Sequence, residues 1–167
     1  MKRIFWTFLL IVNSGIQAVS AQENFVQING STNINNFKCI NNAFNLPEGT
    51  SLTGKLPAIA LKVNDFDCHN KVMTKDFRET LHSDKYPNLD IKILKFVKNQ
   101  NAYSAQVEVL MMSKSRTYNV SFNLENGKYV GKKMVKFSEF GIRPPKKMGG
   151  MIIVKDDLNL IFTLSAR

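Results

Sequence analysis

The stretch YSAQVEVLM, residues 103–111, alternates between apolar and polar side chains along most of its length. An extended strand directs successive side chains to opposite sides of a sheet. A period of two therefore predicts a strand with one buried face and one solvent face. The same alternation recurs in residues 59–63, 118–124 and 158–164.

Short polar connections separate these runs. KNQNA at residues 98–102 and ENGK at residues 125–128 are examples. The pair Asn126–Gly127 readily takes the positive φ angles that tight hairpins need. Neighbouring strands are therefore predicted to be antiparallel.

A single stretch has clear helical spacing. Met73, Phe77 and Leu81 lie four residues apart within NKVMTKDFRETLHS, and Tyr86–Pro87 then stops the helix. The sequence thus predicts an all-β fold with one short helix: an antiparallel, lipocalin-like β-barrel of about eight strands. A barrel of that size is either filled by side chains or holds one small ligand, and both alternatives stay open.

The first residues resemble a secretory signal peptide. Lys2 and Arg3 precede an apolar run at residues 4–12, and AVSA ends at Ala21. The run is too short for a membrane-spanning helix, although an uncleaved anchor is the alternative. We predict a signal peptide at residues 1–21, one domain at residues 22–167, and a periplasmic or secreted location.

The predicted mature chain is basic. Without Lys2 and Arg3 it has 21 basic residues against 13 acidic ones, a formal net charge of +8. This charge favours anionic partners, but the lysines are spread along the chain, which is also typical of simple solubility. A nucleic-acid partner is not predicted, because the aromatic residues alternate with polar ones in a pattern that turns them inward.

Two cysteines, Cys39 and Cys68, lie in the mature part. In an oxidising compartment such a pair usually forms a disulfide, which we predict here. A metal site formed with His69 is the weaker alternative, because no fourth ligand is apparent. The sequence calls for no cofactor and no metal.

Three segments resemble the YceI-like family of lipid- and polyisoprenoid-binding periplasmic proteins. They are DFRETLHSDKYPNLDIKI at residues 76–93, ENGK at residues 125–128, and FSEFGIRPPKKMGGMIIVKDDLNLIFTL at residues 137–164. The resemblance covers roughly residues 25–164. It implies a lipocalin-like barrel whose interior accepts a long apolar chain without catalysis. The early His-Ser pair of better-known members is missing, since Ser31 and Thr32 stand in that region.

The inward positions of the alternating strands are the predicted ligand-binding cavity wall. They are Leu61, Ile93, Val107, Val109, Tyr118, Val120, Phe122, Phe137, Leu160 and Phe162. Prolines 144 and 145 end one strand, and Gly149 and Gly150 let the chain turn back. The loop that contains these prolines and glycines carries Arg143, Lys146 and Lys147, the predicted basic site for an anionic head group; a simply solvated loop is the alternative.

The predicted function is an exported lipid-binding protein that sequesters or carries an amphiphilic apolar chain, isoprenoid or fatty-acid-like. The alternative is a ligand-free barrel that acts as an envelope interaction module for anionic surfaces, including transient contact with an anionic membrane, or for partner proteins. An enzyme is not predicted. The residue types of a hydrolase triad occur together at His82, Ser83 and Asp84, but the side chains of consecutive residues cannot converge on one point. The sequence does not predict an oligomeric state.

Overall fold

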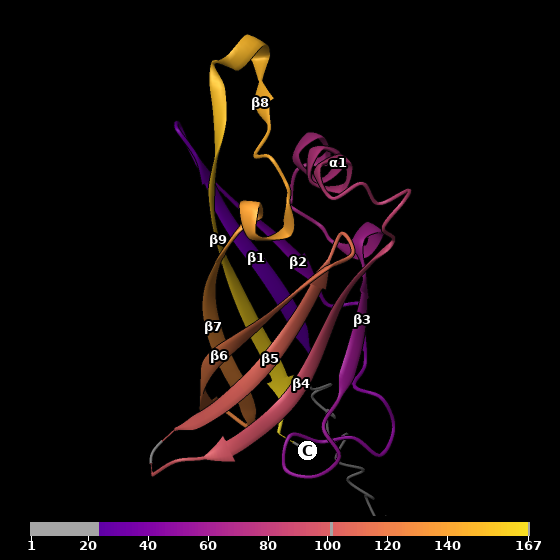
Figure 1. Cartoon of the computed structure of the whole chain (residues 1–167), viewed down its shortest axis with the longest axis vertical. Coiled ribbons are helices and arrows are strands. Elements are labelled where there is room, and N and C mark those ends of the chain that lie inside the picture. The colour runs from indigo at the N-terminus through magenta and orange to yellow at the C-terminus, as the bar shows by residue number, and fades with distance from the viewer. Residues whose placement is uncertain (1–23, 101, 167) are drawn as a thin grey trace, which may run out of the picture.

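The computed structural model describes residues 24–100 and 102–166. The signal peptide predicted for residues 1–21 lies outside the described residues. In chain order the elements are β1 (Phe25–Thr32), β2 (Asn36–Asn41), β3 (Ala58–Lys62), η1 (Val63–Asp65), α1 (Lys71–Thr80), β4 (Asn88–Lys98), β5 (Tyr103–Met111), β6 (Lys114–Glu125), β7 (Lys128–Lys136), η2 (Phe137–Phe140), β8 (Lys146–Lys147), η3 (Met148–Gly150) and β9 (Ile152–Ser165). Figure 1 shows their arrangement.

The strands form one strongly curled antiparallel sheet in the order β2-β1-β9-β7-β6-β5-β4-β3, and β8 pairs with β9 alone (Figure 1). This confirms the predicted lipocalin-like architecture with one short helix among the described residues. The sheet is a half-barrel, because its two end strands, β2 and β3, do not form a ladder with each other.

The gap between the end strands is closed by the segment that follows β3. Ile40 and Asp67 form an isolated antiparallel bridge, with N–H···O distances of 2.8 and 2.9 Å. Next to this bridge Cys39 and Cys68 form the predicted disulfide. The amide of Asn41 also donates to the carbonyl of Lys62 at 3.0 Å. A disulfide and a few hydrogen bonds therefore take the place of a strand ladder between β2 and β3.

Two-residue hairpins join β5 to β6 and β6 to β7. The β6–β7 turn is Asn126–Gly127, with φ of 49° and 74°, as the sequence predicts. Met112–Ser113 takes the same left-handed geometry between β5 and β6, with φ of 50° and 62°. Both turns match the twist of the flanking strands.

The core fills the inside of the curled sheet with large apolar side chains. Phe122, Gly131 and Phe162 are neighbours across β6, β7 and β9. A Cβ atom added at Gly131 would lie 2.6 Å from the ring of Phe122, so the glycine leaves room for that ring. The Phe122 and Phe162 rings are 6.1 Å apart. At one end, Leu52 of the loop between β2 and β3 is buried in the same core.

Helix α1 lies at the other end. Asn70 caps its first turn by accepting hydrogen bonds from the backbone of Val72 and Met73. Phe77 turns inward and its ring lies 5.4 Å from that of Phe66. Figure 1 shows α1 at the same end as the β8–β9 hairpin, which projects beyond the rest of the sheet. No helix within the described ranges has the length and apolar character needed to cross a bilayer.

Candidate functional site

A pocket of about 580 Å³ lies at the helix-covered end of the half-barrel. Three segments that are distant in sequence line most of it. The β1–β2 hairpin contributes Ile34 from its turn and Phe37 from β2, and α1 contributes Val72, Met73 and Phe77. The β8–β9 hairpin contributes Pro145, Lys147, Met148, Ile152 and Val154.

The β1–β2 turn is tied to the β8–β9 hairpin by the side chain of Asn33. Its amide donates to the carbonyl of Met151 at 2.9 Å, and its carbonyl oxygen accepts from the amide of Ile153 at 2.9 Å. The hydroxyl of Thr32 accepts hydrogen bonds from the backbone of Ile34 and Asn35 within the turn. These bonds fix two walls of the pocket relative to each other.

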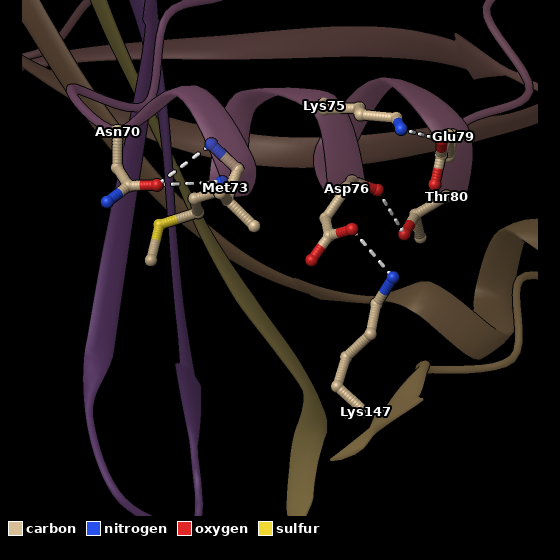
Figure 2. Close-up of polar contacts among 8 residues, drawn as sticks. Asn70, Met73, Lys75, Asp76, Glu79, Thr80 and Lys147 are labelled. Atoms are coloured by element: carbon tan, nitrogen blue, oxygen red, sulfur yellow. Dashed lines mark hydrogen bonds and ion pairs between the residues drawn. The ribbon is translucent and has the colours of Figure 1, made fainter. Parts of the chain in front are cut away.

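The third wall, α1, is tied to β8 by an ion pair. The ammonium of Lys147 lies 2.7 Å from Oδ1 of Asp76, and both side chains line the pocket (Figure 2). About a third of each side chain is exposed, 37% for Lys147 and 34% for Asp76. Thr80 donates its hydroxyl to the carbonyl of Asp76 at 2.7 Å, one turn along α1 (Figure 2). The pocket thus has one ion pair among walls that are mostly apolar.

The inner end of the pocket is formed by Phe137 of η2. Beside it, the hydroxyl of Tyr118 donates to Glu139 at 2.9 Å, and the same carboxylate accepts from the amide of Lys136 at 2.8 Å. Burial raises the pKa of Tyr118 far above its usual value, and the hydrogen bond to Glu139 adds to the shift. The phenol therefore remains a neutral donor that anchors η2 against β6.

A second anchor of η2 comes from the irregular part of β9. Asp156 accepts hydrogen bonds from the backbone and the hydroxyl of Ser138, at 2.9 and 2.6 Å. These hydrogen bonds hold the pKa of Asp156 below its usual value. The register between β1 and β9 shifts here, from Gly30 opposite Leu158 to Thr32 opposite Val154. The shift turns Val154 toward the pocket.

Three solved structures are similar to this fold over most of the chain. BcnA of Burkholderia cenocepacia matches with a TM-score of 0.66 and 16% identity, over 88% of this chain and 98% of that one. A polyisoprenoid-binding domain from Saccharophagus degradans, implicated in plant cell wall breakdown, matches with a TM-score of 0.60 and 8% identity, over 86% and 94%. The YCEI protein of Campylobacter jejuni matches with a TM-score of 0.55 and 13% identity, over 99% and 98%.

The chain has the YceI-like fold. No protein-family model and no curated protein matches the sequence. At 8–16% identity the likeness establishes the three-dimensional arrangement. The disulfide agrees with a protein that folds outside the cytoplasm, because such bonds persist in oxidising compartments.

Within the YceI-like fold, the predicted wall residues divide into two groups. Phe137 lines the pocket. The others lie deeper, on the inner face of the sheet: Leu61, Ile93, Val107, Val109, Val120, Phe122, Leu160 and Phe162 are buried in the core, and Tyr118 packs against it partly buried. Their role in ligand binding stays a prediction.

The predicted basic residues also separate. Lys147 lines the pocket, where its ammonium is already paired with Asp76. Lys146 pairs with Ile153 across the hairpin and is exposed on the side of the hairpin opposite to Lys147. Arg143 is exposed as well. The head-group role of Arg143, Lys146 and Lys147 stays a prediction.

Most of the lining residues were not among the predicted site residues. Met73 and Phe77 have a signal in the sequence, because their helical spacing marks an apolar face of α1. Ile34 lies in a polar turn, and contacts of Thr32 and Asn33 with the distant β8–β9 hairpin bring it to the pocket. Sequence spacing carries no signal for those contacts.

Proposed function

We propose that this protein binds an amphiphilic lipid and holds the apolar chain in the pocket between α1, the β1–β2 turn and the β8–β9 hairpin. The observation that carries the proposal is the lining: ten of the seventeen residues around the 580 Å³ pocket are apolar. Ligand pockets of this size are typically apolar with a few polar groups that orient the ligand. Here the polar groups include Asp76 and Lys147.

The energy of such binding comes from removing the chain from water. Each buried methylene contributes about 0.8 kcal/mol, so ten contribute about 8 kcal/mol. That energy corresponds to a micromolar dissociation constant before the costs of association are subtracted. Because the costs of association reduce this value, micromolar binding requires a chain of more than ten methylenes or additional contacts with the polar groups.

The polar head would lie beside the Asp76–Lys147 pair. Lys147 is the better partner for a phosphate or carboxylate, and its contact with such a group would compete with Asp76 at 2.7 Å. A neutral hydroxyl head could bond to Asp76 without breaking the pair. The pair therefore favours heads that are small and hydrogen-bonding.

The solved domain from Saccharophagus degradans that binds polyisoprenoid has the same fold, which supports an isoprenoid or fatty-acid-like chain as the ligand class. In an exported protein the role would be to sequester or carry such a lipid. Catalysis plays no part in this proposal, because transfer of an apolar chain between environments requires a protected site and no bond-breaking step.

The test is lipid content and uptake. Native mass spectrometry of protein purified after export should reveal a bound lipid, and a fluorescent long-chain fatty acid should bind with saturation. Val154→Trp should lower that binding by about tenfold or more, because the indole occupies space now lined by Val154. Val97→Trp on the outer side of β4 is the matched control, since Val97 is 39% exposed and does not line the pocket.

Equal uptake by the two variants would show that the lipid does not use this pocket. Absence of both co-purified lipid and probe uptake in the unaltered protein would refute lipid binding. That outcome would favour the ligand-free interaction module instead. Circular dichroism and thermal unfolding of both variants verify that the sheet is intact.

A further inference from the structure

Five exposed apolar side chains lie on the three segments that form the pocket, and we call them the apolar rim. They are Ile34, Val72, Met148, Met151 and Ile153. Of these, Ile34, Val72 and Met148 also line the pocket. Val72 is 70% exposed and Met151 is 67% exposed. Single exposed apolar residues are normal on protein surfaces, but a group of them at one end marks an interaction site.

The apolar rim is assembled from three separate segments. Ile34 is in the β1–β2 turn, Val72 begins α1, and the other members belong to the β8–β9 hairpin. Asn33 ties the turn to the hairpin, and the Asp76–Lys147 pair ties α1 to the hairpin. The three segments that carry the apolar rim therefore lie at one end of the molecule, where α1 and the β8–β9 hairpin are found (Figure 1).

Lysines flank the apolar rim. Lys146 and Lys155 are exposed on the same side of the β8–β9 hairpin as Ile153, and Lys71 precedes Val72 on α1. Of the ion pairs within residues 24–100 and 102–166, none includes Lys71, Lys146 or Lys155. The acidic neighbours are engaged elsewhere, since Asp76 pairs with Lys147 and Asp156 bonds to Ser138.

We propose that the apolar rim and these lysines dock the protein on an anionic lipid bilayer, with the mouth of the pocket facing the membrane. Apolar tips insert at the boundary between head groups and acyl chains, and lysines beside them are attracted to anionic head groups. The basic net charge of the chain favours the same partner. The inference rests on the proposed lipid-binding function in one respect: docking would let a lipid pass directly between bilayer and pocket.

The test compares two double variants for binding to vesicles. Met151→Asp with Lys155→Glu alters the rim and its flank, and neither residue lines the pocket. Met134→Asp with Lys132→Glu on the outer face of β7 is the matched control. It carries the same chemical changes and the same change in net charge, and Met134 is as exposed as Met151, at 66%.

Unaltered protein should co-sediment with vesicles of equal parts phosphatidylglycerol and phosphatidylcholine, and much less with phosphatidylcholine alone. The rim variant should bind the anionic vesicles about tenfold more weakly than the control variant, because it loses an inserted side chain and an attracted charge. Equal binding by both variants would overturn the docking surface. Equal binding of the unaltered protein to neutral vesicles would overturn the charge preference.

A tryptophan reporter tests insertion directly. Trp6 is the sole tryptophan of the sequence and lies in the predicted signal peptide. Met151→Trp should show a blue-shifted emission and quenching by brominated lipid on anionic vesicles, whereas Met134→Trp should show neither. A Met151→Trp spectrum unchanged by vesicles would refute insertion.

The outcome is separable from lipid binding in the pocket. Uptake of the fluorescent fatty acid in vesicle-free buffer should be equal in the rim variant and the control variant. Loss of vesicle binding with retained uptake supports docking as a separate property. Loss of uptake in the rim variant would show that these positions belong to the pocket and would overturn the assignment of the surface to the membrane.

Discussion

The disulfide between Cys39 and Cys68 is expected to be a large single contribution to the stability of this fold. It links residues 29 apart in sequence. In the chain-entropy model, closing a loop of that length removes about 12 cal/mol/K from the unfolded state, or about 3.6 kcal/mol at 25 °C. Domains of this size are stable by only about 5–15 kcal/mol, so the bond is a substantial fraction of the total.

Replacing the cysteines by alanine separates the cross-link from the packing of the sulfur atoms. Both residues are buried, Cys39 completely and Cys68 at 5% exposure. Each substitution leaves a small cavity that costs about 1 kcal/mol, similar to the loss of a buried methyl group. Each single variant also loses the whole cross-link. Single variants should therefore lose about 4.6 kcal/mol and the double variant about 5.6 kcal/mol.

Urea unfolding followed by circular dichroism measures these values. With a slope of about 1.5–2 kcal/mol/M, loss of the cross-link alone lowers the midpoint by about 2 M. The reasoning depends on non-additivity, because the two residues share one bond. If the loss in the double variant equals the sum of the two single losses, the stabilisation comes from side-chain packing and the cross-link account is refuted.

The loss should also be uneven across the molecule. The bridge between Ile40 and Asp67 lies beside the disulfide and is held otherwise by two backbone hydrogen bonds. Local opening there becomes easier once the cross-link is absent. Amide hydrogen exchange in reduced protein should therefore accelerate more at Ile40 and Asp67 than at Val107 in the middle of β5.

Two further predictions concern positions that fix η2 and the core. Gly131→Ala should destabilise the protein by about 1–3 kcal/mol in urea unfolding, because the added methyl would lie 2.6 Å from the buried ring of Phe122; unchanged stability would contradict the close contact. Asp156→Ala should cost about 1 kcal/mol at pH 7, because Ser138 loses its acceptor, while Asp157→Ala on the exposed side is the control. The folded pKa of Asp156 is depressed, so its contribution to stability is present above the unfolded pKa of about 4 and is lost as the pH falls through the lower folded value. A stability difference between Asp156→Ala and unaltered protein that persists undiminished below that range would refute the hydrogen-bond account.

The sequence predicts the regular part of the fold well. The alternation in residues 103–111 matches the bounds of β5 because one face of that strand is buried from Ala105 to Met111 and partly buried at Tyr103. The pair Asn126–Gly127 predicts its hairpin because both residues accept positive φ at low cost. Each of these signals is local, and each predicts the backbone conformation of the residues in which it occurs.

Other features depend on contacts that local patterns do not report. Met112–Ser113 has no turn composition, yet the register of Met111 with Lys114 leaves two residues for the turn and forces positive φ on both. The apolar run at the start of β9, Ile152 to Val154, lacks alternation, and its inward positions follow from the register shift with β1. In both places tertiary pairing decides the backbone.

The position of the pocket follows from the length of β9 relative to its neighbours. Its ladder with β7 ends at Asp157, and β9 extends beyond this point. That part finds a partner in β8, whose ladder is only two residues long, because the two prolines before it have no N–H to donate. The narrow β8–β9 hairpin covers less of this end of the core than a full sheet would. The space between it and α1 is filled partly by Phe137, and the remainder is the pocket.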